Sequence, residues 1–263
     1  MILNGWTTLA TNTKRALKLF QQAPKLIISP ALDKWLIETQ GDLELDDELL
    51  AIMSEAMRGA RPHVEPGMSP SALGGCIRAQ VMKYAGAKRE KEYDSVTLNL
   101  LNDGKYRHLR WQAMLLKAGL LDEIETFVTN GTLRGFIDGI KHNEYIFELK
   151  GISSLARVRT GPLSKHKRQI YAYMILTGIN TCVLIYEDKQ TQEWKEFVIT
   201  IDDISDKDKI SIEEEMSDFE AFTDTQTLPE RLKKCEEKDG FDYKYCSYKG
   251  ICFACEKWED ISV

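Results

Sequence analysis

The stretch TLRGFIDGIKHNEYIFELKG, Thr132–Gly151, decides the predicted fold and carries the first functional signal. Two apolar segments flank the polar turn KHNE, a pattern typical of a β-hairpin. If the turn centres near Asn143, residues whose numbers sum to 286 face each other, so Asp138 lies opposite Glu148. Lys150 follows Glu148 by two residues, and side chains alternate between the two faces of a strand. We therefore expect Asp138, Glu148 and Lys150 to project from one face of the hairpin.

Directly opposed residues of a hairpin have Cβ atoms roughly 5 Å apart. Two carboxylates this close repel each other unless a cation lies between them. Mg²⁺ meets this need with oxygen ligands, and Lys150 could orient or deprotonate a metal-bound water or neutralise a phosphate. We expect burial and the field of the metal to lower the pKa of Lys150. The resulting chemistry is metal-assisted hydrolysis of a phosphodiester. The alternative is an ordinary hairpin with a solvated charged face. The apolar neighbours, and Gly135 and Gly139 near Asp138, favour a site that a ligand or backbone approaches closely.

The segments around this hairpin predict a mixed protein of helices and strands. Strand patterns cover Glu123–Thr129, Thr132–Ile140, Tyr145–Leu149, Cys182–Glu187 and Trp194–Ile201. Helical patterns cover Asp46–Met57, a segment capped by Ser69 or Ser71 that runs to about Tyr84, a segment capped by Asp103 that runs to about Ala118, Lys165–Leu176, and the acid-rich residues 202–224. Helices before, between and after the strands indicate the α/β class, with a central mixed β-sheet flanked by helices.

Two of these helical segments carry polar pairs at helical spacing. In GKYRHLRWQ, His108 and Gln112 are four residues apart, and a neutral imidazole can bind a divalent metal, with a preference for Mn²⁺ over Mg²⁺. In KHKRQIYAYM, Gln169 and Tyr173 have the same spacing and could contact a phosphate or stack on a base. The alternatives are a packed histidine and a core helix with a half-buried Tyr173.

The composition excludes a protein with a generally basic, nucleic-acid-binding surface. The chain has 263 residues and a formal net charge of −6, so nucleic-acid binding requires a local patch. The sizeable basic run lies between Ile152 and Gln169, directly after Lys150, and also contains His166. Its cationic residues are Arg157, Arg159, Lys165, Lys167 and Arg168. A cationic rim beside the carboxylates can bind the phosphates of DNA. The alternative is a flexible solvated loop.

The sequence also predicts a cytoplasmic protein without a membrane partner. No run approaches the roughly 20 apolar residues of a membrane span, and the N-terminus lacks the pattern of a secretory signal. The six cysteines are therefore expected in a reducing compartment. Cys246, Cys252 and Cys255 fall within ten residues of one another, which favours ligation of a metal or cluster over disulfides.

Taken in order along residues 66–256, these motifs resemble the RecB-like branch of the PD-(D/E)XK nucleases. More narrowly, the chain resembles the iron–sulfur exonucleases of CRISPR adaptation and their phage-encoded relatives. The similar segments are SPSALGGCIRAQVMKYAG, GKYRHLRWQ, LRGFIDGI, FELKG, KHKRQIYAYMIL and CSYKGICF. Ile137 stands where the name-giving proline of the family would be, and the RecB branch often lacks this proline.

The resemblance implies a restriction-endonuclease-like core and a metal-dependent DNA exonuclease of a bacterial or phage-infected cell. The activity it implies is directed at single-stranded DNA or DNA ends. The implied ligands of Mg²⁺ or Mn²⁺ are His108, Asp138, Glu148 and the backbone carbonyl of Leu149. The implied catalytic residues are Asp138, Glu148 and Lys150, assisted by Gln169 and Tyr173.

The resemblance further implies a cysteine-rich C-terminal closure around a structural [4Fe–4S] cluster. Zinc is the alternative, because both groups take four thiolates. The family spacing C-x2-C-x5-C matches Cys246 and Cys252 at its last two positions, whereas Tyr243 stands at the first. The implied ligands are Cys76, Cys246, Cys252, and either Cys235 or Cys255. Cys182, inside the apolar run TCVLIY, is expected to be an ordinary buried cysteine.

We expect a helical lead and linker over residues 1–65 and the nuclease domain over 66–263. Two other classes of function stay open on the sequence. One is a non-catalytic nucleic-acid-binding protein on a nuclease-like frame. The other is a zinc-stapled scaffold that uses the acidic segment 202–224 as its partner surface, although that segment also fits an ordinary solvated helix. The sequence leaves the oligomeric state undecided.

Overall fold

The computed structural model describes residues 25–58, 67–90, 93–238 and 240–261. Most of the predicted lead (1–24) and of the linker (59–66) lies outside these residues. The longer helices are α2 (Ser29–Thr39), α3 (Asp47–Arg58), α4 (Ile77–Tyr84), α5 (Ser95–Lys117), α6 (Ser164–Thr177), α7 (Asp206–Asp224), α8 (Phe241–Tyr245) and α9 (Lys249–Ala254). The strands are β1 (Glu123–Thr129), β2 (Arg134–Lys141), β3 (Tyr145–Ile152), β4 (Thr181–Asp188) and β5 (Trp194–Thr200).

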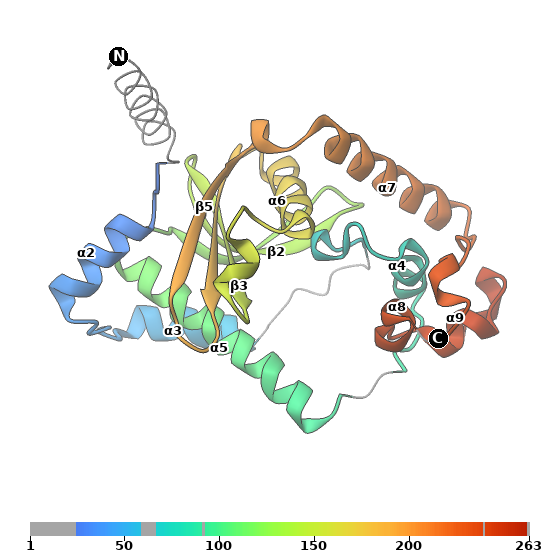
Figure 1. The fold of residues 1–263 in the computed structure, drawn as a ribbon, viewed down its shortest axis with the longest axis horizontal. Coiled ribbons are helices and arrows are strands. Elements are labelled where there is room, and N and C mark those ends of the chain that lie inside the picture. Colours follow the sequence, from blue (N-terminus) through green and yellow to red (C-terminus); the bar gives the residue numbers. More distant parts are fainter. Residues whose placement is uncertain (1–24, 59–66, 91–92, 239, 262–263) are drawn as a thin grey trace, which may run out of the picture.

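The five strands form one mixed sheet in the order β1-β2-β3-β4-β5. β3 and β4 are parallel, whereas the other neighbouring pairs are antiparallel. α6 connects the two parallel strands, which need such a long crossover. Helices lie on both sides of the sheet (Figure 1). This arrangement confirms the predicted α/β fold with a central mixed sheet flanked by helices.

Alternating side chains of the strands build a core on each face of the sheet. On one face Ile146 and Leu184 pack with residues of α6 and α7, including Phe219. On the other face Phe147 and Val183 pack with residues of α2 and α5. The central strands are therefore buried on both faces, as expected of strands in the middle of a covered sheet.

α2 belongs to this second core and is fixed by a carboxylate from β5. Glu196 is buried and accepts hydrogen bonds from the backbone nitrogens of Ile27, Ile28 and Ser29 at 2.6, 3.1 and 2.6 Å. It thus satisfies N–H groups at the start of α2 that have no partner within the helix. Ile28 and Leu32 are fully buried in the same core. α2, which belongs to the predicted N-terminal lead, therefore shares a core with the sheet and α5, on the other side of the expected boundary at residue 65.

Two predicted helix starts are wrong, whereas α3 and α6 agree with their predictions to within one residue. α5 begins at Ser95, where Asp94 caps it by accepting from the backbone nitrogen of Thr97 at 2.7 Å. Asp103 lies inside the helix and pairs with Arg107. The predicted start at Ser69 or Ser71 gives only a short 3-10 turn, Pro70–Ala72, and α4 begins at Ile77. Gly74, with φ +78°, separates the turn from the helix.

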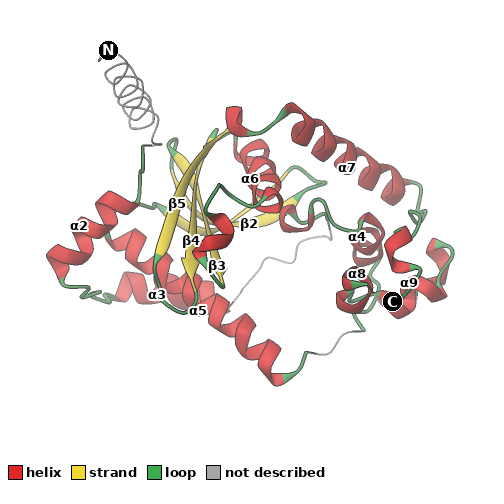
Figure 2. Cartoon of the chain, in the orientation of Figure 1, coloured by secondary structure: helices red, strands yellow, loops and turns green. Residues whose placement is uncertain are grey.

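The C-terminal helices α8 and α9 gather beside α4, away from the sheet (Figure 2). Arg78 of α4 is buried and donates to the carbonyls of Pro229 and Cys255, at 2.5 and 2.6 Å. The acidic helix α7 is more than a solvated surface: Glu215 accepts from the backbone of Gly74 and from Arg168. None of the helices in the described ranges is both long and apolar enough to cross a membrane.

Candidate active site at the fork of the sheet

The sheet opens into a fork where β2 meets β3. Their pairing covers the three pairs nearest the turn, Gly139↔Phe147, Ile140↔Ile146 and Lys141↔Tyr145, and the numbers of each pair sum to 286 as predicted. This ladder ends one pair short of Asp138 and Glu148, so the expected direct pairing of these two residues is not formed. Beyond the fork β3 pairs with β4, while β2 pairs with β1. Asp138 and Glu148 therefore stand on either side of the opening.

Asp138 forms an ion pair with a histidine of α5. Its Oδ1 lies 3.2 Å from Nδ1 of His108, and its Oδ2 accepts from the backbone nitrogen of Leu149 at 2.8 Å. Burial would raise the pKa of Asp138, but the charges of His108 and Lys150 outweigh it, so this pKa lies below its ordinary value. Burial would also lower the pKa of His108, but Asp138 outweighs it and raises this pKa.

Glu148 is a buried carboxylate of which only one oxygen has partners among the described residues. The side chain is 2% exposed, and its Oε1 lies 2.5 Å from Nζ of Lys150 and accepts from Nε2 of Gln169 at 2.9 Å. Its other oxygen, Oε2, is buried and has no hydrogen-bond partner among the described residues. Burial, and then the charge of Asp138, raises the pKa of Glu148 to about 7. The carboxylate therefore lacks a cation on the side of Oε2.

Lys150 remains an ammonium in this arrangement. Burial would lower its pKa, but Glu148 and Asp138 outweigh burial and raise it. This direction differs from the predicted lowering, because two carboxylates surround the amine in the protein without metal. The structure does bring Asp138, Glu148 and Lys150 together, as the strand alternation predicts.

Gln169 and Tyr173 of α6 hold the two sides of the fork. The amide of Gln169 bonds Glu148, and its nitrogen lies 3.5 Å from the hydroxyl of Tyr173. That hydroxyl donates to the carbonyl of Phe136 on β2 at 2.8 Å. A Cβ at Gly135 would lie 3.2 Å from the Tyr173 ring, so the glycine makes room for this side chain, whereas the sequence predicts close approach of a ligand or backbone. Tyr173 is buried rather than half-buried.

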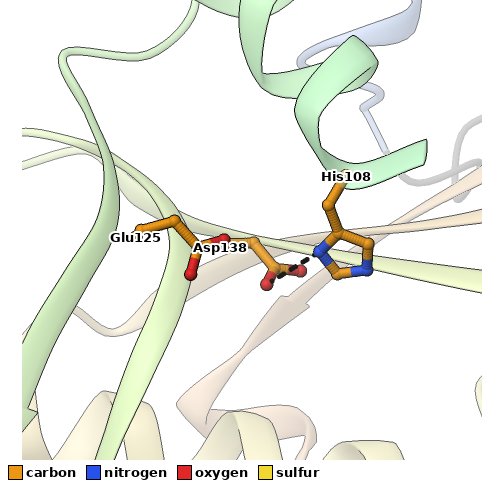
Figure 3. A group of neighbouring side chains, drawn as sticks. All are labelled: His108, Glu125 and Asp138. Atoms are coloured by element: carbon orange, nitrogen blue, oxygen red, sulfur yellow. Dashed lines mark ion pairs between the residues drawn. The ribbon is translucent and has the colours of Figure 1, made fainter. Parts of the chain in front are cut away.

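The sequence did not single out Glu125 of β1. Ligand atoms of Glu125, His108 and Asp138 all lie within 4.8 Å of one another, in a group that among the described residues has the spacing of a metal site (Figure 3). Gln112 of α5 donates its Nε2 to Glu125 Oε1 at 2.9 Å and to the carbonyl of Asp138 at 2.8 Å. Within EIETFVT, Glu125 resembles any solvated strand residue, and no local signal identifies it.

The predicted cationic rim is only partly available to a ligand. Arg157, Arg159 and Lys165 are exposed, and Lys167 is partly buried. Arg168 differs from the prediction: it lies 2.7 Å from Glu215 of α7 and is largely buried in that ion pair. The position of Arg168 therefore indicates a structural contact between α6 and α7.

His166, inside this rim, is hydrogen-bonded to Tyr186 of β4. Its Nδ1 lies 2.6 Å from the Tyr186 hydroxyl, and that hydroxyl also accepts from the backbone nitrogen of Leu163 at 3.1 Å. Burial, followed by the charges of Lys150 and Lys165, lowers the pKa of His166 to about 3. The ring is neutral at physiological pH.

Four cysteines surround a second feature, a cavity of about 330 Å³ beside α4, α8 and α9. Its cysteines are Cys76, Cys235, Cys246 and Cys252. Cys255 does not line this cavity, and its Sγ donates to the carbonyl of Asp260 at 3.2 Å. Burial, and then the charges of the three neighbouring cysteines, raises the pKa of Cys76. Four thiolates here would need a cationic group. Cys182 is fully buried on β4, as expected.

The shared lining brings together cysteines from distant parts of the chain, since Cys76 precedes α4 and the other three belong to the C-terminal segment. Four thiolates are the donor set both of structural zinc and of an iron–sulfur cluster.

Comparisons with known proteins give only distant likenesses. No family model and no curated protein matches the chain. In structure it is similar to the protein SSO0001, with 20% identity and a TM-score of 0.47 over 80% of this chain and 96% of that chain. It is also similar to an alkaline exonuclease from Laribacter hongkongensis, with 16% identity and a TM-score of 0.41 over 61% of this chain and 89% of that chain. A phage-related exonuclease from Haemophilus somnus gives 13% identity and a TM-score of 0.43 over 62% and 95%. The chemistry of this chain has to be inferred from its own side chains.

Proposed function

We propose that this protein is a metal-dependent nuclease that hydrolyses phosphodiester bonds of DNA. The observation that carries the proposal is the buried convergence of Asp138, Glu148 and Lys150, with Glu148 Oε2 left without a partner. A buried carboxylate oxygen without a partner is unfavourable. A divalent cation beside Oε2 would supply the missing charge and bond.

The donor set fits such a cation. His108, Asp138, Glu148 and the carbonyl of Leu149 would hold it, a mixture of oxygen and imidazole donors that suits Mg²⁺ or Mn²⁺. When bound, the cation would polarise a phosphoryl oxygen and acidify a water molecule.

The chain's own residues perform the remaining tasks. Lys150, whose Nζ lies 2.5 Å from Glu148 Oε1, can place a positive charge where a scissile phosphate brings negative charge. Gln169 fixes the Glu148 carboxylate, and Tyr173 fixes the β2 backbone through the carbonyl of Phe136. These contacts hold both sides of the fork at a constant separation, as a preorganised site requires.

We propose DNA as the substrate because the exposed cations Arg157, Arg159 and Lys165 follow directly after the strand that carries Lys150. Side chains of this kind bind successive phosphates without reading sequence. Exonuclease action on single strands or DNA ends is the finer form of the proposal, and it rests on the resemblance of the ordered motifs.

We also propose that Cys76, Cys235, Cys246 and Cys252 hold a structural [4Fe–4S] cluster. The shared cavity supports these four cysteines as one ligand set, and the separate hydrogen bond of Cys255 supports Cys235 as the fourth ligand. The choice of a cluster over zinc rests on the resemblance of the ordered motifs. The scaffold alternative has less support, because α7 uses Glu213, Glu215 and Glu220 for contacts within the chain.

A digestion assay with labelled DNA tests the nuclease proposal. Linear single-stranded, linear double-stranded and circular single-stranded DNA are incubated with the protein and Mg²⁺, Mn²⁺ or EDTA. We expect metal-dependent shortening of linear DNA, intact circles, and a loss of at least about 100-fold in Asp138→Asn and Lys150→Met. Glu144→Gln, in the exposed turn of the same hairpin, is the matched control. A folded, metal-loaded wild type that binds DNA without cleaving it would establish the non-catalytic alternative.

The cluster proposal has its own test. After anaerobic purification we expect the wild type and Cys255→Ser to contain iron and acid-labile sulfide with visible absorption, and Cys235→Ser to lose them. Stoichiometric zinc in a colourless wild type, or the reverse behaviour of the two variants, would refute the assignment.

A further inference from the structure

We infer that Glu125 is an additional ligand of the divalent cation held by His108 and Asp138, and that Gln112 is the positioning residue of Glu125. The inference rests on the proposed metal-dependent function and adds to the site a residue from a third element, β1. Neither the resemblance nor the pattern of the sequence assigns a role to either residue.

The first support is the geometry of the three side chains. Figure 3 shows His108, Glu125 and Asp138 directed toward one another from α5, β1 and β2. Each offers one ligand atom, and these atoms lie within 4.8 Å of one another. Ligands at about 2.0–2.2 Å from one cation stand at most about 4.4 Å apart. The observed group therefore needs only small displacements to close around an ion.

The backbone brings Glu125 to this position through a local break in the strand. The ladder between β1 and β2 pairs Ile124 with Gly139 and Thr126 with Ile137, and it skips the pair between them, Glu125 and Asp138. Glu125 has a φ of +48°, a left-handed conformation that a side chain other than glycine rarely adopts. Unfavourable backbone conformations of this kind persist where neighbouring contacts impose them.

Gln112 supplies those contacts. Its side chain is 2% exposed, and the two protons of its amide are directed to Glu125 Oε1 at 2.9 Å and to the carbonyl of Asp138 at 2.8 Å. One side chain of α5 thus ties the Glu125 carboxylate to the backbone of the residue that pairs with His108. Groups that orient a metal ligand in this way sustain the affinity of the site for its metal.

Glu148 supplies a second observation that points to a cation in the fork. Its Oε2 is buried without a hydrogen-bond partner among the described residues, although Glu148 does not belong to the group of three whose ligand atoms lie within 4.8 Å of one another. The five side chains of the site comprise three carboxylates, Glu125, Asp138 and Glu148, against two cationic groups, His108 and Lys150. A divalent cation among the carboxylates would reduce this excess of negative charge.

A titration of the metal-free full chain with Mn²⁺ tests the inference without reference to activity. Calorimetry and the signal of free Mn²⁺ in electron paramagnetic resonance both report affinity. We expect Glu125→Gln to weaken Mn²⁺ binding by about 10- to 100-fold and Gln112→Met by about 10-fold. Glu123→Gln is the matched control, because Glu123 lies on the same strand, is exposed, and pairs with His142 instead. We expect its affinity to equal that of the wild type.

Each outcome decides between the two proposals. If Asp138→Asn abolishes binding while Glu125→Gln binds like the wild type, the role of Glu125 is refuted and the proposed function stands. If Asp138→Asn itself binds like the wild type, the proposed metal site is refuted. Equal losses in Glu125→Gln and Glu123→Gln would mean an effect of net charge and would refute ligation. Normal affinity in Gln112→Met, beside a loss in Glu125→Gln, would refute only the positioning role.

A second measurement covers the case in which a variant folds poorly. Far-ultraviolet circular dichroism and the metal-free unfolding midpoint identify such a variant. The wild type then carries the test through anomalous scattering from a crystal soaked in Mn²⁺. We expect an ion within about 2.6 Å of a Glu125 oxygen. An ion held by the other ligands with Glu125 farther away would overturn the inference.

Discussion

Replacement of Glu148 by glutamine should stabilise the protein when no metal is bound. Glutamine keeps the shape of the side chain and the acceptor for Gln169, but it removes a buried charge that lies beside Asp138. The buried Oε2 position is then occupied by a neutral group, which costs less to bury than an ion. A residue of the proposed active site is therefore expected to lower the stability of the metal-free protein.

The magnitude follows from the pKa of Glu148. Its pKa rises from an ordinary value of 4.5 to about 7, and this difference corresponds to about 3 kcal/mol. Because the folded state binds the proton more tightly, the protonated carboxyl contributes stability that is fully present below pH 4.5 and lost as the pH rises through about 7. The free energy of unfolding of Glu148→Gln should therefore exceed that of the wild type by about 3 kcal/mol at pH 8 and by about half as much at pH 5.5.

Urea denaturation in EDTA at the two pH values measures this difference in the free energy of unfolding. Glu144→Gln makes the same change of charge at an exposed turn and should leave the difference near zero at both values. Addition of Mn²⁺ at pH 8 should then stabilise the wild type far more than Glu148→Gln, because the ion binds the folded carboxylates. A Glu148→Gln protein that is no more stable than the wild type at pH 8 in EDTA would refute the argument that burial and repulsion strain this site.

Three further predictions concern residues outside the carboxylate pair. Glu196→Ala should lower the free energy of unfolding by about 2 kcal/mol or more, because three backbone N–H groups lose their acceptor. Glu193→Ala, in the exposed turn beside it, should not lower it, and equal effects of the two variants in urea denaturation would contradict the prediction. Glu187→Gln should cost about 3 kcal/mol in the same assay, because it removes the buried carboxylate that pairs with Arg107 and leaves this buried guanidinium with only the exposed Asp103 as a charged partner; a cost below about 1 kcal/mol would argue against the pair as a support of α5. His166 should keep a neutral ring from pH 5 to 8 in long-range ¹H–¹⁵N spectra, and a titration midpoint near 6.5 would contradict its burial. Since the unfolded ring takes its proton at higher pH than the folded one, His166 should also make the free energy of unfolding fall as the pH drops from about 6.5 toward 3.

The hairpin and its register could be predicted because their determinants are local. The polar turn fixes the centre of Thr132–Gly151, and the alternation of apolar residues fixes which side chains share a face. Asp138, Glu148 and Lys150 follow from these two facts alone. The end of the ladder is not local, because beyond it β3 pairs with β4 and β2 with β1, and β4 lies more than 30 residues further along the chain. The sequence therefore predicts which residues meet at the site but not the fork that separates their strands.

The start of α5 was missed because the prediction took Asp103 as its cap. Asp94 carries the capping contact in the structure, and Asp103 and Gly104 lie inside the helix. A glycine inside a helix costs about 1 kcal/mol relative to alanine, which a long helix can tolerate. The first turns of α5 are largely exposed, so the apolar pattern that locates the buried part of the helix does not reach its start.

Other contacts join residues too far apart for any pattern to connect. Glu196 caps a helix that begins 167 residues earlier, and Glu215 bonds a loop 141 residues earlier. The choice between Cys235 and Cys255 is of the same kind, since both lie near the motif and only the tertiary fold places Cys235 at the cavity. Sequence spacing supplies the candidates in these cases, and the fold selects among them.

The fork explains why the site needs both covering helices. In a continuous ladder, Asp138 and Glu148 would face each other as a residue pair, and their backbone N–H and C=O groups would form hydrogen bonds within the sheet. Where the ladder stops, α5 takes the carbonyl of Asp138 through Gln112, and α6 takes the Glu148 carboxylate through Gln169. Gln112 thus bonds a backbone carbonyl of β2 and Gln169 bonds a side chain of β3, and the two donors lie on helices that cover different faces of the sheet. It follows that the distance between the carboxylates depends on how α5 and α6 pack on opposite faces of the sheet, and substitutions that shift either helix should alter metal affinity before they unfold the protein.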